Sequence, residues 1–168
     1  MTSGHHNAAL PVPTSAIPSS GIVRVRARYC ECDPMGVVHH AAYIPWLELG
    51  RTELLREAGV SYAQIEAAGY YLVVAQLECS YRRPGRYDDL VEVRTRVSGG
   101  SRVKITHEYE VALVERVGEG RVEAGQRPAP RDGTGPGEVL MTGSSVLVCV
   151  TREGKVRELP EWLVGVKR

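Results

Sequence analysis

The first clear pattern in the chain is an alternation of apolar and basic residues. It covers IVRVRARYC, residues 22–30, and predicts a strand with one buried and one exposed face. The basic face is interpreted as a solvated or interfacial surface rather than an anion site, because its charge is balanced elsewhere in the chain. The buried face would hold Val23, Val25, Ala27 and Tyr29, and the exposed face Arg24, Arg26 and Arg28.

The period then changes to that of a helix. Pro34 and Gly36 interrupt the alternation and predict a loop at 31–38. From residue 41 to residue 60, apolar residues recur at intervals of three or four, which predicts a helix with one wide apolar side that ends at Gly59. Pro45 is tolerated only in a first turn, so regular helix is expected to begin near Ile44 or to have a distorted start. A glycine inside a helix, here Gly50, indicates close packing, and we expect a sheet to lie against it.

The rest of the chain is strand-rich. A short helical turn at 61–69 precedes four long strand patterns, and a serine–glycine link at 98–101 predicts a hairpin. One strand, one long helix and four strands in hairpin-like succession predict an α+β fold, an antiparallel sheet of about five strands with one helix to cover. One helix cannot cover so broad a sheet, so its uncovered face and edges predict pairing between subunits. The strand patterns are residues 70–83, 90–97, 102–117 and 137–151, with a possible short edge strand at 155–160.

Composition divides the chain into a tail and one domain. Residues 1–21 are rich in Pro, Ser and Ala and are predicted to form a disordered tail, and residues 22–168 suit a single domain. Residues 118–137 are rich in Gly and Pro and are interpreted as an insertion in a hairpin, a passive surface loop rather than an active-site flap.

Net charge and cysteine content limit the kinds of partner and the cellular compartment that the sequence predicts. With 21 basic and 20 acidic residues the net charge is +1, which argues against nucleic acid or an anionic membrane surface as a partner. No apolar stretch approaches the ~20 residues of a membrane span. The beginning of the sequence lacks the features of a secretory signal, so a cytoplasmic location with reduced thiols is expected. The cysteines Cys30, Cys32, Cys79 and Cys149 show no disulfide-framework spacing.

The stretch ECDPMGVVHHAAY, residues 31–43, gathers the candidate chemistry. Cys30 and Cys32 followed by His39 and His40 do not have the spacing of a structural zinc site, and buried thiols are the favoured interpretation. A thiol nucleophile is disfavoured as well, because the carboxylate of Asp33 directly follows Cys32 and opposes a thiolate.

Asp33 remains as a candidate catalytic carboxylate. It lies on a loop that leads into the long helix, whose first amides have no intrahelical acceptor and can hold an oxyanion. The alternative is that Asp33 and Pro34 form an ordinary turn in which the aspartate is the capping residue. Spacing alone favours this alternative.

Three stretches resemble the hotdog-fold acyl-CoA thioesterases, in the 4-hydroxybenzoyl-CoA thioesterase branch that includes the small Tol–Pal-associated enzymes. RYCECDPMGVVHHAAYIPWLELGRTELLREAGV is similar to the family's D-x-x-G-[VI]-V-x-[HYF]-x-x-[YF] loop and the helix after it. YRRPGRYDDLVEVRTRV resembles a Y-x-x-P segment followed by D-D-x-L, and VLVCVTREGKVRELPEWL resembles the closing pattern. Together they cover most of residues 22–163.

The resemblance implies a sheet wrapped around one long helix, a homo-oligomer (dimer or tetramer), and hydrolysis of an acyl-CoA substrate without metal or organic cofactor. It implies that Asp33 is the catalytic carboxylate, as nucleophile or general base, that Gly36 lets the loop turn, and that the amide of His40 polarises the thioester carbonyl. Glu48 would be a second carboxylate, although an ion pair with Arg51 or Arg82 is favoured. Candidate contacts to CoA are Arg82, Arg83, Ser101 and Arg102.

Other members of the fold remain alternatives. A non-catalytic acyl-CoA-binding protein is disfavoured by the presence of Asp33 beside Gly36, and a hotdog dehydratase by the order of residues in the loop. Acyl carrier protein in place of CoA stays open, as does the identity of the acyl group.

Overall fold

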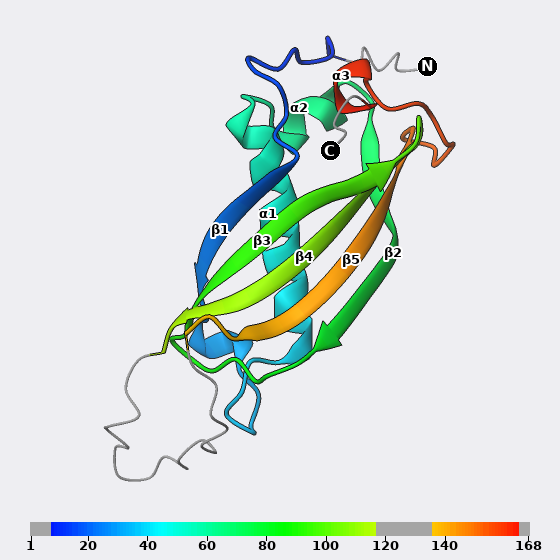
Figure 1. The fold of residues 1–168 in the computed structure, drawn as a ribbon. Coiled ribbons are helices and arrows are strands. Elements are labelled where there is room, and N and C mark those ends of the chain that lie inside the picture. Colours follow the sequence, from blue (N-terminus) through cyan, green and yellow to red (C-terminus); the bar gives the residue numbers. More distant parts are fainter. Residues whose placement is uncertain (1–7, 117–135, 165–168) are drawn as a thin grey trace.

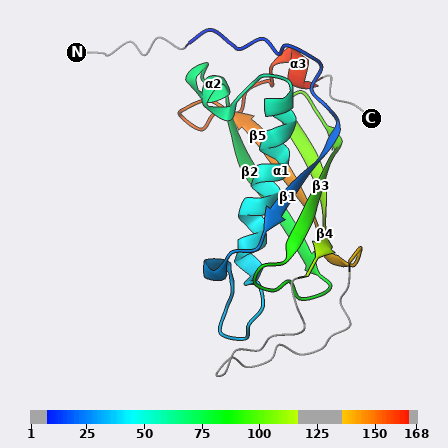
Figure 2. The same cartoon turned by 90° about the vertical axis from the view of Figure 1, so that its left-hand side faces the viewer.

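The computed structural model describes residues 8–116 and 136–164. Five antiparallel strands form one sheet in the order β1-β3-β4-β5-β2, and a long helix, α1, lies along one face of it (Figures 1 and 2). The predicted α+β architecture is confirmed. The strands are β1 (Ser20–Arg26), β2 (Tyr71–Tyr81), β3 (Leu90–Gly100), β4 (Lys104–Glu115) and β5 (Val139–Val150), and the helices are η1 (Tyr29–Glu31), η2 (His40–Ala42), α1 (Tyr43–Glu57), α2 (Tyr62–Ala67) and α3 (Glu161–Val164).

Periodicity explains how α1 and the sheet share a core. The buried side of α1 follows the helical period, and β3 alternates buried and exposed residues over most of its length. Side chains from both elements form two apolar clusters, one around Leu47 near the start of α1 and one around Leu54 near its end. The buried residues of α1 are Tyr43, Trp46, Leu47, Gly50, Arg51, Leu54 and Leu55.

The start of α1 accommodates Pro45 in the way that the sequence allowed. A single 3₁₀ turn, η2, precedes α1, and Pro45 is the third residue of α1. At this position the missing amide hydrogen would have no intrahelical acceptor. Regular helix therefore begins at Tyr43, next to Ile44, as one of the two expectations stated, and the chain before it forms the 3₁₀ turn.

Gly50 lies where α1 packs tightly against the sheet. A Cβ atom at this position would overlap Thr95 Oγ1 and lie 3.3 Å from Val93 Cγ1, both on β3. Thr95 is 2% exposed and its stiff, β-branched side chain has little room to move. The predicted close packing against the sheet is confirmed.

We expect Gly50→Ala to lower the free energy of unfolding by about 1–3 kcal/mol through overpacking, although alanine favours a helix by about 1 kcal/mol. Urea unfolding of the purified protein measures the change. Thr95→Ala in the same chain should restore most of the loss, because Thr95 Oγ1 has no hydrogen-bond partner within the described residues. A Gly50→Ala protein as stable as wild type would contradict the assignment of a tight contact.

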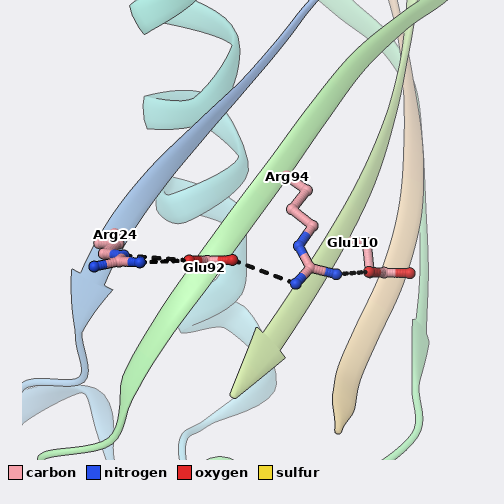
Figure 3. Close-up of polar contacts among 4 residues, drawn as sticks. All are labelled: Arg24, Glu92, Arg94 and Glu110. Atoms are coloured by element: carbon pink, nitrogen blue, oxygen red, sulfur yellow. Dashed lines mark hydrogen bonds and ion pairs between the residues drawn. The ribbon is translucent and has the colours of Figure 1, made fainter. Parts of the chain in front are cut away.

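The arginines of β1 are balanced by acidic residues on the outer face of the sheet. Arg24 contacts Glu92 at 2.9 Å, Glu92 contacts Arg94 at 3.3 Å, and Arg94 contacts Glu110 at 2.6 Å (Figure 3). These residues face one another across β1, β3 and β4 in the strand register. Exposed pairs of this kind contribute little stability singly, about 0–1 kcal/mol each. The prediction of a charge-balanced basic face is confirmed.

Three features differ from the sequence prediction by more than two residues at a strand end. The first strand ends at Arg26 rather than residue 30, because the chain turns into η1. The segment 155–160 forms a single bridge, Val150 with Val156, instead of an edge strand. The β3–β4 hairpin is present, with its turn two or three residues later than the serine–glycine link suggested.

The predicted disordered tail to Gly21 is not seen in its described part. Thr14 donates its backbone amide to Ala58 O at 2.9 Å, and Ile17 packs against the cluster around Leu54. The first strand already begins at Ser20. A few apolar and capping contacts anchor a segment whose overall composition indicated disorder.

Most of the predicted insertion and the first residues of the predicted tail lie outside the described residues. The Gly/Pro-rich insertion at 118–137 connects β4 to β5, and all but its last two residues lie outside the described residues, as do residues 1–7 of the tail. Within residues 8–116 and 136–164, no helix has the length and apolar character needed to cross a membrane.

Candidate functional site

The loop between β1 and α1 is closed at its base by backbone pairing. Cys32 and Val38 form an antiparallel bridge, and the amide of Asp33 donates to Val37 O at 2.9 Å. Gly36 turns the chain with a φ of +80°, a left-handed conformation that glycine adopts without strain. The loop therefore places Asp33 at its start and directs the chain back toward the start of α1.

The carboxylate of Asp33 is held within this loop. Its Oδ1 accepts the amide of Met35 at 2.8 Å, which is the capping contact that spacing alone had favoured. Its Oδ2 accepts no hydrogen bond from the described part of the chain, and the side chain is partly exposed. One oxygen orients the carboxylate and the other is available to a ligand.

The start of the helix offers an unused amide. The amide of Ala42 donates to His39 O at 2.9 Å, and the amide of Ala41 donates to His39 Nδ1 at 3.2 Å. The amide of His40 has no acceptor among the described residues, and the His40 carbonyl accepts the hydroxyl of Tyr81 at 2.9 Å. The His40 side chain is exposed, with its ring 4.0 Å from that of His39. His39 thus caps the turn, and the amide of His40 is free.

Glu31 anchors the base of the loop. This role of Glu31 was not predicted from the sequence. Its buried carboxylate accepts the amide of Arg28 at 2.7 Å and Trp46 Nε1 at 3.0 Å, and its carbonyl accepts the amide of His39 at 2.8 Å. Burial raises the pKa of Glu31, but the hydrogen bonds from Arg28 and Trp46 lower it by more, so the pKa lies below its ordinary value. Glu31 therefore ties η1, η2 and α1 together as an ionised group.

The loop after β2 lies beside the Asp33 loop. The amide of Val38 donates to Gly85 O at 2.8 Å, and the amide of Gly85 donates to Tyr43 Oη at 3.3 Å. Arg82 and Arg83 precede this point, and both are exposed. The structure therefore brings Asp33, His40 and the two arginines to one end of the sheet.

Ser101 and Arg102 lie at the other end. They form the β3–β4 turn, which is opposite the β1–α1 loop in Figure 1. Arg102 pairs with Glu158 at 2.8 Å. Ser101 accepts the amide of Val103 at 3.3 Å. Within one subunit, these two residues cannot join a site at Asp33.

The remaining sequence candidates have other surroundings. Glu48 pairs with Arg51 at 3.3 Å, as the sequence favoured. Burial raises the pKa of the Cys32 thiol, and the nearby carboxylates of Glu31 and Asp33 add to the effect, so a thiolate is disfavoured there. The histidines and cysteines of this loop, within the described ranges, do not gather with other possible ligands into a group of three.

A buried histidine lies between the two apolar clusters. Burial, together with the nearby charge of Arg51, lowers the pKa of His107 from 6.5 to about 4. The unfolded chain therefore takes up a proton first as the pH falls, so the contribution of His107 to stability is present above pH 6.5 and is lost between pH 6.5 and 4.

We expect the wild type to lose about 3 kcal/mol relative to His107→Phe between pH 7 and 4. Urea unfolding at several pH values measures this difference, and it cancels the titration of carboxylates common to both proteins. If the free energies of unfolding of the two proteins change with pH in the same way, protonation of His107 does not destabilise the fold.

Comparison with known proteins shows which family this chain resembles. The model of the thioesterase-like superfamily matches residues 27–165, which include the Asp33 loop. A putative acyl-CoA thioesterase of Bacillus subtilis, YneP, is 33% identical over 87 residues, which cover 52% of this chain and 63% of the relative. The acyl-CoA thioester hydrolase YbgC of Escherichia coli is 36% identical over 74 residues, which cover 44% and 55%. The chain thus spans less than two thirds of each of these two relatives.

A solved structure extends the likeness over most of the fold. The DHNA-CoA thioesterase of Staphylococcus aureus superposes with a TM-score of 0.68 at 29% identity, covering 83% of this chain and 80% of that chain. The five-stranded sheet and its long helix are thereby confirmed as a hotdog fold. The chain belongs to the thioesterase-like superfamily.

Proposed function

We propose that this protein hydrolyses an acyl-CoA thioester to the free acid and CoA. The observation that carries the proposal is the pairing, across one closed loop, of the Asp33 carboxylate with the backbone amide of His40. In the described part of the chain, one oxygen of that carboxylate accepts no hydrogen bond and the amide has no acceptor. The relatives named above are described as acyl-CoA thioesterases or thioester hydrolases, which supports the same activity here.

The two groups have complementary tasks. The amide of His40 donates to the thioester oxygen as negative charge develops on it in the tetrahedral intermediate. Asp33 either takes a proton from the attacking water or attacks the carbonyl carbon itself. In the first case hydroxide adds, CoA leaves as a thiolate, and the proton moves to it. In the second case the C–S bond of the adduct breaks, CoA leaves as a thiolate, and the acyl group stays on Asp33 as a mixed anhydride, which water then hydrolyses.

A homo-oligomer, dimer or tetramer, belongs to this proposal. The sheet ends in the edge strand β2, whose Val74 and Leu77 are exposed on the side that faces α1. Ile44 and Leu49 of α1 are exposed as well. A second copy would bury these side chains. It would also bring another β3–β4 turn within reach, so that Ser101 and Arg102 of one copy could serve CoA bound near Arg82 and Arg83 of another.

The test is a panel of thioesters supplied to the purified full chain. Release of free thiol from aromatic, short aliphatic and long aliphatic acyl-CoAs, followed with a thiol reagent, identifies the substrate class. The same acyl groups on acyl carrier protein test the alternative carrier. Binding of acyl-CoA without thiol release would favour the non-catalytic alternative and overturn the proposal. The cytoplasmic location stays a prediction.

A further inference from the structure

A layer of polar side chains divides the core beneath α1. Arg51 lies between the clusters around Leu47 and Leu54, and it is 8% exposed. From the sheet, His107 is 4% exposed, and Tyr109 shares a hydrogen bond of 2.7 Å with Ser145. Such groups are costly to bury unless they find partners.

Two nitrogen atoms of this layer lack a partner. Within the described residues, Arg51 Nε and His107 Nδ1 are buried without a hydrogen bond. Burial raises the pKa of Tyr62 and of Tyr109, and the charge of Arg51 opposes the increase in both, which places these hydroxyls beside the guanidinium. The layer is therefore rich in donors and carries a positive charge.

The acidic partner of Arg51 is weakly held. Glu48 approaches Arg51 at 3.3 Å, but its side chain is 65% exposed against 8% for the arginine. A small cavity of about 20 Å³, lined by Arg51, Tyr62, Leu72 and His107, adjoins the layer. The guanidinium thus lies between a cavity on the inside and a solvated carboxylate on the outside.

The strand register leads from the proposed site to this layer. Tyr81 of β2, which donates to the His40 carbonyl, is opposite Met141 of β5. Four residues along β2, Leu77 is opposite Ser145, which in turn is opposite His107 of β4. The distance between these two rows along the strands is ~13 Å.

The row between them lies on the inner face of the sheet, which is partly exposed at β2. It contains Cys79, Gly143 and Tyr109. At Gly143 the backbone of β2 comes close, because a Cβ atom there would lie 2.6 Å from Glu78 O. Cys79 is partly exposed and Leu77 is 36% exposed. An extended chain that starts at the His40 amide can therefore run along the inner face of β2 and end at the polar layer.

We infer that the acyl group of the substrate follows this path and carries a carboxylate at its distal end, which Arg51 and His107 bind. The inference rests on the proposed function and names its substrate class, an ω-carboxyacyl thioester. One carboxylate would accept hydrogen bonds from Arg51 Nε and from the N–H of neutral His107. Glu48, being mostly exposed, would turn into solvent as the new carboxylate replaces it.

The experiment compares acyl-CoA pairs of equal chain length, one ending in a carboxylate and the other in a methyl group, over a series of lengths. The quantity measured is the ratio of kcat/KM for the two members. We expect the carboxylate to be preferred by about 10- to 100-fold at the best length, the range that hydrogen bonds to a charged group give.

Two variants assign the preference to the polar layer. Arg51→Met should lower kcat/KM for the carboxylate substrate by about 10- to 100-fold while changing that for the methyl substrate by less than about 3-fold. Glu48→Gln removes the competing carboxylate and should raise the ratio. A purely structural role of Arg51 would instead lower both values together. Circular dichroism checks that each variant is folded. If Arg51→Met does not fold, the comparison is made with Glu48→Gln, which changes an exposed residue.

The outcomes separate this inference from the proposed function. Hydrolysis of both substrates with equal kcat/KM, or a ratio that Arg51→Met leaves unchanged or that Glu48→Gln lowers, would overturn the inference and leave the hydrolase proposal standing. Failure to hydrolyse any acyl-CoA would overturn the proposed function itself.

Discussion

Asp33→Asn is expected to reduce kcat for acyl-CoA hydrolysis by about 10²–10⁴-fold, the usual contribution of a positioned acid or base. The reason is specific to the carboxylate. The amide that replaces it can neither accept a proton from water nor attack a thioester, but its oxygen can still accept the amide of Met35 as Oδ1 does at 2.8 Å. The loop should therefore keep its shape while the chemistry is lost. Thiol release under saturating acyl-CoA measures kcat.

Asp88→Asn is the matched control for this variant. It makes the same chemical change on the neighbouring loop, at a residue with a φ of +66°, which asparagine tolerates. Asp88 contacts Arg26 at 3.5 Å on the surface. We expect this control to retain activity within about 3-fold, because an exposed pair contributes little. An Asp33→Asn protein as active as the control would remove Asp33 from the mechanism.

Asp89→Asn is expected to lower the free energy of unfolding by about 3–5 kcal/mol, since it breaks one half of a buried ion pair. Asp89 is fully buried and accepts Arg116 Nη2 at 2.7 Å, Arg116 Nε at 2.9 Å and the amide of Arg86 at 2.8 Å. Arg116, with 10% of its side chain exposed, also donates to Pro84 O at 3.0 Å. Loss of the charge leaves the guanidinium buried beside the loop that holds Gly85 against the site.

Urea unfolding followed by circular dichroism measures this loss. Asp88→Asn serves again as the control, one residue away and partly exposed, with an expected change of less than about 1 kcal/mol. If both variants unfold at the same urea concentration, the Asp89–Arg116 pair does not stabilise the fold.

Periodicity predicted the large elements of this fold. The change from an alternation of two to a period of three or four located α1, and the clash of a Cβ at Gly50 with Thr95 bears out the expected contact with the sheet. Local rules also covered the helix start, since Pro45 has to lie in the first turn. These features depend on residues that are close together in the sequence, so sequence patterns can predict them.

The residues that hold the candidate site in place have partners far away in the sequence, so local sequence patterns could not predict them. Glu31 was included in the predicted loop without a role of its own, because its partner Trp46 lies 15 residues further on. The hydroxyl of Tyr81 reaches the His40 carbonyl from 41 residues away. The loop pattern and the resemblance made Asp33 a candidate catalytic carboxylate, while the residues that hold its surroundings became visible only when the chain was folded.

A structure of the Asp33→Asn protein with an acyl-CoA bound would be the sharpest test of the proposed site. Since this variant should bind the thioester without consuming it, the position of the carbonyl group can be observed. We predict that the thioester oxygen lies 2.7–3.1 Å from the backbone nitrogen of His40, at the geometry of an oxyanion donor, with the side chain at position 33 next to the carbonyl carbon. A thioester bound elsewhere, or with its oxygen turned away from the His40 amide, would contradict the proposed site.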